Sequence, residues 1–273
     1  MSSGFLRVLL TGAPLFIVGM LGSRTVTSQG SRQTPAPAKG SPVVVELFTS
    51  EGCSSCPPAD ALLARLAEES SAGHAQVVAL EEHVDYWDDL GWRDPFSSHR
   101  WTERQYVYAG VLGNGNPYTP QMVVDGGVEF TGSRAQQAQR AIAEAASRAK
   151  IPVSLSEQRA ESRPGTENFL VEVGKLIPSK KGGAAEVWLA ITETGLHSSV
   201  SRGENAGNEL RHAAVVRLMR KIGEAKADGD VSFAGKATVS LRGEWKQANL
   251  KAVAFVQEKN SLRILGATEV PLQ

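Results

Sequence analysis

Two cysteines three positions apart are the residues of this chain best suited to chemistry. Cys53 and Cys56 form a Cys-x-x-Cys motif and are the only cysteines present. The motif follows a β-branched run at 42–48 and precedes apolar residues at helical spacing, which places it between a strand and a helix N-terminus. The unpaired N–H groups and the dipole there favour thiolate over thiol. We therefore expect Cys53 to attack and Cys56 to resolve the mixed disulfide.

Two other uses of the cysteine pair stay open. A structural bridge would close a loop of about four residues and contribute only about 2 kcal/mol, because the entropy gained grows with the length of the closed loop. A metal site needs further ligands, and the five histidines are scattered along the sequence. His83 or Met122 could complete a copper(I) site with the two thiolates, since copper(I) is a soft ion.

Three further residues fit the redox interpretation. Thr119-Pro120 stands directly before an expected strand. A cis proline there would bring backbone close to the cysteine pair and leave Thr119 free to pair with an extended substrate; a trans turn proline is the alternative. Glu46 lies in the apolar run that leads to the motif. It is either a buried carboxyl that exchanges a proton with Cys56 or an outward-facing strand residue. The candidate catalytic residues are therefore Cys53, Cys56, Pro120, Thr119 and Glu46.

The elements that must position these residues alternate between strand and helix in the first half of the chain. A parallel strand pair joined by a helix comes first. Asp94 and the proline after it mark the start of a second helix, and Gly110 marks its end. The expected elements are a strand at 42–48, a helix from about 59, a strand at 75–80, a helix at 96–108, a hairpin at 121–130 and a helix after 133.

After residue 150 the pattern changes to short β-rich runs separated by glycines and charges. Six or more strands without crossover helices are typical of an antiparallel sandwich. The segment 213–222 fits a strand or a helix. We therefore predict an α/β domain at 42–150, followed by a β-rich, sandwich-like domain at 151–273.

The N-terminal residues resemble a secretory signal peptide. The apolar run at 5–21 is interrupted by Gly12 and Pro14 and falls short of the roughly 20 residues that span a bilayer. We assign 1–30 to the signal peptide and 31–41 to an extended linker. The expected protein is exported, periplasmic or extracellular, and has no stable membrane anchor.

The composition argues against a polyanion-binding protein. The chain has 29 basic and 29 acidic side chains, a formal net charge of +0, so no overall field attracts nucleic acid. Hydrophobic residues make up 41% and charged residues 21%, which favours a packed core over disorder. The expected partner carries a thiol or a disulfide and is a protein or a small molecule. No cofactor and no nucleic acid are expected.

Long motifs in both halves point to a family. Their sequences are VELFTSEGCSSCPPAD (45–60), HVDYWDDLGWRDPFSSHRWTERQYVYA (83–109), YTPQMVVDG (118–126), RGEN (202–205) and HAAVVR (212–217). They resemble the secreted proteins grouped as domain-of-unknown-function family 1223. The order of elements up to residue 150 resembles the thioredoxin fold. The resemblance implies a thioredoxin-like domain joined to a β-rich domain in an exported bacterial protein.

Carried over residue by residue, the thioredoxin resemblance implies a nucleophile at Cys53, a resolving thiol at Cys56 and a cis proline at Pro120. The acidic position of the leading strand matches Glu46 only with an offset of one residue. The family itself supplies no reaction.

Two further clusters combine polar and aromatic residues. The segment 83–101 holds three tryptophans and several acids. We expect it to be a structural segment that covers the core of the domain; the alternative is a substrate groove beside Cys53. The second cluster lies in a turn-rich part of the second half. We expect it to form hydrogen bonds between the halves, with a ligand site as the alternative; its members are Arg202, Glu204, Asn205 and His212.

The function that fits these features best is thiol-disulfide exchange, with attack by Cys53 and resolution by Cys56. The alternative is a partner- or copper(I)-binding module whose cysteine pair is redox-inert. A thiol pKa well below the free value of about 8.5 would distinguish the enzyme from the binding module.

Overall fold

Every described helix and strand of this computed structural model falls within residues Lys39–Gln273, which form one unit. The structure describes residues 1, 4, 41–70, 76–113, 115–158, 165–176, 184–227 and 229–272. The predicted signal peptide (1–30) and linker (31–41) therefore lie outside the described residues, apart from positions 1, 4 and 41. Within the described part, no helix is long and apolar enough to cross a membrane.

The first half contains the expected order of elements. These are β1 (Val43–Thr49), α1 (Pro57–Ser70), β2 (Val77–His83), α2 (His99–Leu112), β3 (Gln121–Val124), β4 (Val128–Thr131) and α3 (Ala135–Ala146). Helix α2 begins and ends later than predicted. Ser98 caps its N-terminus, and Gly113 ends it with a φ of 84°. Asp94 does not cap α2, because the helix begins only at His99; its carboxylate accepts a hydrogen bond from the N–H of Phe96 instead.

The second half is built from strands. They are β5 (Val153–Glu157), β6 (Thr166–Gly174), β7 (Ala185–Glu193), β8 (Leu196–Ser199), β9 (Glu209–His212), β10 (Val215–Ala225), β11 (Val231–Ser240), β12 (Leu250–Glu258) and β13 (Ile264–Pro271), with a short 3-10 helix at Gln247–Asn249. The segment that fitted strand or helix equally is therefore strand β10.

The predicted fold class is wrong. Strands from both halves form one eight-stranded mixed sheet in the order β13-β12-β7-β10-β2-β1-β3-β4. Strand β10 lies parallel to β2, with Val215 opposite Glu81, and pairs with β7 on its other side. The described chain is thus mostly β with three α-helices, not a thioredoxin-like α/β domain followed by a separate sandwich.

The irregularity of β10 explains this error. Its pairing with β7 shifts register between Val216 and Leu218 and again between Lys221 and Gly223. Such bulges break the alternation of inward and outward side chains by which a strand is recognised in a sequence. The one segment that joins the two halves therefore has a weak strand pattern.

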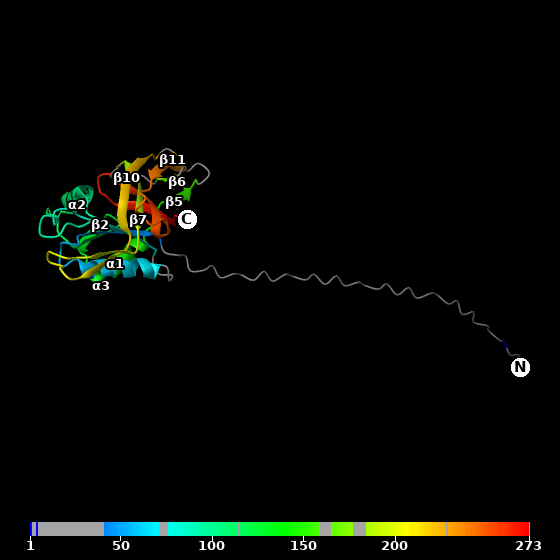
Figure 1. Ribbon diagram of the computed structural model, residues 1–273. Coiled ribbons are helices and arrows are strands. Elements are labelled where there is room, and N and C mark those ends of the chain that lie inside the picture. The colour runs from blue at the N-terminus through cyan, green and yellow to red at the C-terminus, as the bar shows by residue number, and fades with distance from the viewer. Residues whose placement is uncertain are drawn as a thin grey trace. The chain divides into compact units, whose positions relative to one another are not determined.

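Two smaller sheets complete the fold. Strands β11, β6 and β5 form an antiparallel sheet, and apolar side chains of β5, β6 and β11 share a core with those of β7 and β12. Strands β8 and β9 form a separate hairpin. In Figure 1, β10 rises beside β7 toward the β11-β6-β5 sheet.

The central strands have two different faces, because side chains alternate along a strand. The odd-numbered residues of β1 and the apolar residues Val77 and Ala79 of β2 pack with α1 and α3. Val44 and Leu80 pack instead with Trp101 of α2 and with β10 and β12. Figure 1 accordingly shows α1 and α3 together and α2 apart from them.

Because both halves share one sheet, we expect residues 39–273 to unfold in one step. Leu80 is fully buried on β2 among side chains of β10 and β12. Leu80→Ala should lower the free energy of unfolding by about 3 kcal/mol, through lost burial and the cavity left behind. Urea denaturation followed by tryptophan fluorescence and far-UV circular dichroism should give coincident transitions.

The matched control is Leu90→Ala, because Leu90 is 61% exposed. It should change the free energy of unfolding by less than about 0.5 kcal/mol. Two separate transitions, of which Leu80→Ala shifts only one, would show that the halves fold independently.

Candidate functional site

The Cys53–Cys56 pair forms a disulfide, with the two Cα atoms 5.5 Å apart. Helix α1 begins directly after it at Pro57. The carbonyl oxygen of Cys56 accepts hydrogen bonds from the N–H groups of Ala59 (2.8 Å) and Asp60 (3.1 Å). Cys56 thus stands at the N-terminal end of the helix, where the sequence places it.

Both cysteines are fully buried, although the sequence led us to expect an accessible Cys53. The serines between them, Ser54 and Ser55, are exposed. The hydroxyl of Ser55 lies 3.3 Å from the sulfur of Cys53. Solvent therefore meets the turn but not the disulfide, and an external thiol reaches neither sulfur unless a neighbouring segment moves.

The segment that covers the cysteine turn is the tip of the β8–β9 hairpin, residues 200–208, here called the hairpin cover. The side-chain amide of Asn205 donates to the carbonyl oxygens of Glu51 (2.8 Å) and Cys53 (3.1 Å). Glu204 accepts a hydrogen bond from the backbone N–H of Ser54 at 3.0 Å. These contacts agree with the predicted hydrogen bonding between the two halves.

The tryptophan-rich segment flanks the same turn. A Cβ on Gly52 would lie 2.9 Å from Cβ of Trp87, so the turn passes directly beneath that side chain. The indole N–H of Trp87 donates to the hydroxyl of Thr119 at 2.8 Å. Gly203 of the hairpin cover, with a φ of 78°, packs against Trp92. These contacts fit a structural segment that covers the core, which is the interpretation that the sequence favours.

The Thr119–Pro120 peptide bond is cis, as predicted. Thr119 reaches the cysteine turn through its hydrogen bond with Trp87. Pro120 lies beside α1, because a Cβ on Gly132 would lie 3.0 Å from Ala59 and 3.3 Å from Pro120. Both residues are thus near the N-terminal end of α1, and their roles in substrate pairing stay predictions.

Glu46 is buried, and its carboxylate faces α2. Nε of Arg104 and the hydroxyl of Tyr108 each donate to it at 2.5 Å. Leu47, the next residue, packs on the opposite face of the sheet with α1. No hydrogen bond joins Glu46 to a cysteine in the described part of the chain. Proton exchange between Glu46 and Cys56 therefore stays a prediction.

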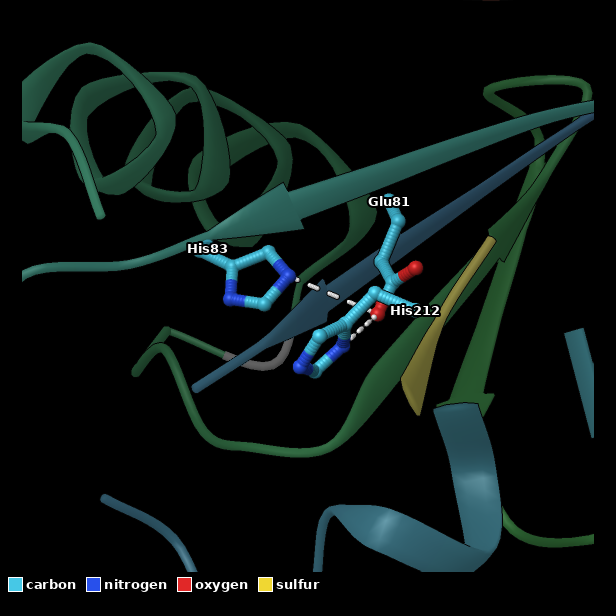
Figure 2. Close-up of side chains that lie close together, drawn as sticks. All are labelled: Glu81, His83 and His212. Carbon is cyan, nitrogen blue, oxygen red and sulfur yellow. Dashed lines mark hydrogen bonds and ion pairs between the residues drawn. The ribbon is translucent and has the colours of Figure 1, made fainter. Parts of the chain in front are cut away.

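Buried carboxylates and imidazoles lie directly against the cysteine turn. We call them the histidine cluster; its members, each under 5% exposed, are Glu51, Asp60, Glu81, His83, Asp94 and His212. Figure 2 shows the imidazoles of His83 and His212 turned toward one oxygen of Glu81. Nδ1 of His212 lies 2.8 Å and Nε2 of His83 3.4 Å from Oε1 of Glu81.

The remaining nitrogen of each ring faces another carboxylate. Nδ1 of His83 lies 2.7 Å from Asp94, and Nε2 of His212 lies 3.1 Å from Glu51. The two rings are 4.7 Å apart. Phe96 packs edge-on against both, with centroid distances of 5.4 and 5.5 Å. The cluster is thus a dry, highly charged site in which every imidazole has carboxylates on two sides.

These carboxylates set the charge of the rings. Burial disfavours a charged imidazole, but Asp94 and Glu81 outweigh it and hold the pKa of His83 well above its usual value. For His212, burial likewise opposes the charge, and Glu81 and Glu51 raise its pKa to about 9. Both rings are therefore protonated at neutral pH in this structure.

Asp60 lies one helical turn after Cys56, on the same side of α1. Burial, with a smaller contribution from the charge of Glu81, raises the pKa of Asp60 to about 7. The hydroxyl of Thr49 donates to its carboxylate at 2.6 Å. A carboxyl that titrates near neutrality at this position can exchange a proton with a neighbouring group.

A protein-family model matches most of the chain. The model of a family described as "Protein of unknown function (DUF1223)" matches residues 44–257. The chain belongs to this family. The family resemblance seen in its motifs is thereby confirmed, and no curated protein matches the chain.

Several solved structures resemble this chain, and two of them cover most of it. The protein AGR_C_4864 from Agrobacterium tumefaciens is 26% identical, with a TM-score of 0.64 over 86% of this chain and 96% of that one. HBP35 of Porphyromonas gingivalis is 18% identical, with a TM-score of 0.61 over 87% of this chain and 77% of that one. The second likeness concerns the fold alone.

Sequence reasoning missed most of the histidine cluster of the DUF1223 chain. It named His83 as a possible copper(I) ligand and as part of the segment 83–101, and His212 as a residue of a hydrogen-bonding cluster with a ligand site as the alternative, but it did not bring the two together. Glu81 and His83 are two apart on a strand and therefore share a face, which is a usable signal. Nothing in the sequence pattern indicates that His212 joins them, because that contact depends on the pairing of β10 with β2.

The pKa of His212 predicts a pH dependence of stability. Protonated His212 contributes stability that is fully present below pH 6.5 and is lost as pH rises through about 9. In chelator-containing buffer, the free energy of unfolding should fall over that range by an amount on the order of 3 kcal/mol. Urea denaturation at a series of pH values should show His212→Gln without this contribution.

The control is His99→Gln, because the side chain of His99 is 72% exposed. This variant should keep the wild-type pH dependence. A folded His212→Gln protein whose stability falls with pH as steeply as that of the wild type would contradict the assignment.

Proposed function

We propose that this protein catalyses thiol-disulfide exchange, with Cys53 as the attacking and Cys56 as the resolving residue. One observation carries the proposal: the two cysteines are joined in a disulfide at the N-terminal end of α1, beneath loops and not inside the sheet. Once reduced, a thiol at that position is favoured as thiolate by the helix dipole.

The exchange balances in atoms and electrons. In the reducing direction, the Cys53 thiolate attacks a substrate disulfide, forms a mixed disulfide and releases one substrate thiolate. The Cys56 thiolate then attacks the sulfur of Cys53, releases the second substrate thiolate and closes the Cys53–Cys56 disulfide. The pair loses two electrons and the substrate gains them. In the oxidising direction, a substrate dithiol takes the same steps in reverse.

The hairpin cover must move before either reaction. Asn205 and Glu204 hold it to the cysteine turn through three hydrogen bonds to backbone groups. Each such bond contributes about 1 kcal/mol net, since water replaces it on opening. Opening a loop tip at this cost is within the range of local unfolding in native proteins. The expected partner carries a thiol or a disulfide. It either displaces the hairpin cover or binds after the cover has opened.

A disulfide also supports export, because the cytosol keeps most thiols reduced. We propose a periplasmic or extracellular location. Thr119 and Pro120 are proposed to face the substrate once the cover has moved, since Thr119 is linked to the cysteine turn through Trp87. Glu46 is buried, and we propose that any effect it has on the cysteines is indirect.

Complete burial of both sulfurs favours a second candidate. In it, the protein is a partner-binding module and the cysteine pair is an inert bridge. A copper(I) version of this candidate needs prior reduction, because the two sulfurs are bonded to each other.

Removing the amide that holds the cover should expose the disulfide. Asn205→Ala deletes two hydrogen bonds to the cysteine turn and should raise the rate of reduction by dithiothreitol about 30-fold, the factor that corresponds to about 2 kcal/mol. The rate is measured by alkylating the released thiols with iodoacetamide and determining the mass of the protein by mass spectrometry. Asn208→Ala, an exposed asparagine of the same hairpin, should react like the wild type.

The catalytic assignment is tested with the reduced protein and a disulfide-bonded model peptide. Cys53→Ser should abolish turnover, and Cys56→Ser should stop at a trapped mixed disulfide. Two outcomes would refute the exchange reaction and favour the inert bridge. In one, the disulfide of Asn205→Ala is as unreactive as that of Asn208→Ala. In the other, Cys53→Ser turns over like the wild type.

A further inference from the structure

Three possible metal-ligand atoms meet in the histidine cluster. Oε1 of Glu81, Nε2 of His83 and Nδ1 of His212 all lie within 4.8 Å of one another. Ligands held about 2.1 Å from a tetrahedral zinc ion lie about 3.4 Å apart. Nε2 of His83 is 3.4 Å from Oε1 of Glu81, and the shorter contact of His212, 2.8 Å, needs only a small outward shift.

The histidine on β2 offers an unused ligand atom. Nε2 of His83 is buried and makes no hydrogen bond to any described residue. A buried polar atom without a hydrogen bond is destabilising, because nothing compensates for its lost contact with water. Figure 2 shows that this nitrogen points toward Glu81 and His212, into the space between the three side chains. An ion bound there would satisfy it.

The surroundings of both rings match those of metal-binding histidines. Such histidines donate their second N–H to a carboxylate, which fixes the ring and makes the ligand nitrogen more basic. Asp94 lies 2.7 Å from Nδ1 of His83, and Glu51 lies 3.1 Å from Nε2 of His212. Each histidine therefore turns its other nitrogen toward Glu81, where one ion would take the place of the protons on these two nitrogens.

We propose that Glu81, His83 and His212 bind one divalent transition-metal ion, with zinc as the best-matched ion. Two imidazoles and one carboxylate are a ligand set that zinc uses in proteins. The site is separate from the disulfide, since no sulfur is among its ligands. A pocket of about 320 Å³ has His212 in its wall; its other lining residues are Gly195, Leu196, His197, Glu209 and Arg211.

The test uses the full chain with its disulfide intact, stripped with a chelator and then titrated with Zn²⁺ against a chromophoric competitor. We expect one Zn²⁺ per chain, a rise in Tm on Zn²⁺ addition, and the visible absorption of a tetrahedral site when Co²⁺ replaces Zn²⁺. His83→Gln and Glu81→Gln should weaken Zn²⁺ binding about 100-fold or more. Asp94→Asn, which removes the charge beside the second nitrogen of His83 but none of the proposed ligand atoms, should weaken it about tenfold.

Two kinds of control separate this site from other binding. His197→Gln, an exposed histidine of the same pocket, should bind Zn²⁺ like the wild type. The double variant Cys53→Ser, Cys56→Ser should also keep binding, which separates the metal site from the exchange reaction. Wild-type protein with no Zn²⁺-dependent rise in Tm overturns the site, whatever the variants do. Equal losses in His197→Gln and His83→Gln, or loss in the double cysteine variant, overturn it as well.

Discussion

Glu81 joins the two halves of the chain at the centre of the large sheet. Its backbone N–H donates to the carbonyl oxygen of Ala214 at 2.9 Å. Its carboxylate accepts from the N–H of Ala213 at 2.8 Å and contacts Nδ1 of His212 at the same distance. Ala214 has a φ of 60°, a conformation that alanine seldom adopts, and these bonds hold it there. A single acidic residue thus fixes where β10 begins and which way the preceding hairpin points.

The cysteine turn and the histidine cluster are coupled through Glu51. Its N–H donates to Asp94 at 2.8 Å, and its carbonyl oxygen accepts from Asn205. Its carboxylate accepts from Trp92 at 2.7 Å and contacts His212 at 3.1 Å. Displacing the hairpin cover therefore disturbs the residue that also supports one ring of the cluster. Events at the disulfide and at the proposed metal site are physically linked, although the two sites share no ligand.

Local structure in this chain follows from local sequence, and the tertiary arrangement does not. The order of elements up to α3, the position of the cysteines at the start of α1 and the cis bond before Pro120 all follow from short-range patterns. The sheet that unites the halves depends on β10, whose bulges hide its period. The predicted separate domains fail for that reason.

The candidate site divides in the same way. The cysteine pair is evident from its spacing. The burial of its sulfurs is not, because the residues that cover it, Glu204 and Asn205, are about 150 positions away in the chain. Likewise, the face shared by Glu81 and His83 follows from strand alternation, but the approach of His212 requires the completed sheet.

The distance in sequence between the cysteine turn and its cover imposes an order on the maturation of the protein. Ser54 and Glu204 are 150 positions apart, so the cysteines emerge from synthesis well before the residues that seal them. While the C-terminal strands are still undocked, the hairpin cover does not lie on the cysteine turn. Docking of these strands therefore shields the disulfide from the thiols of its surroundings.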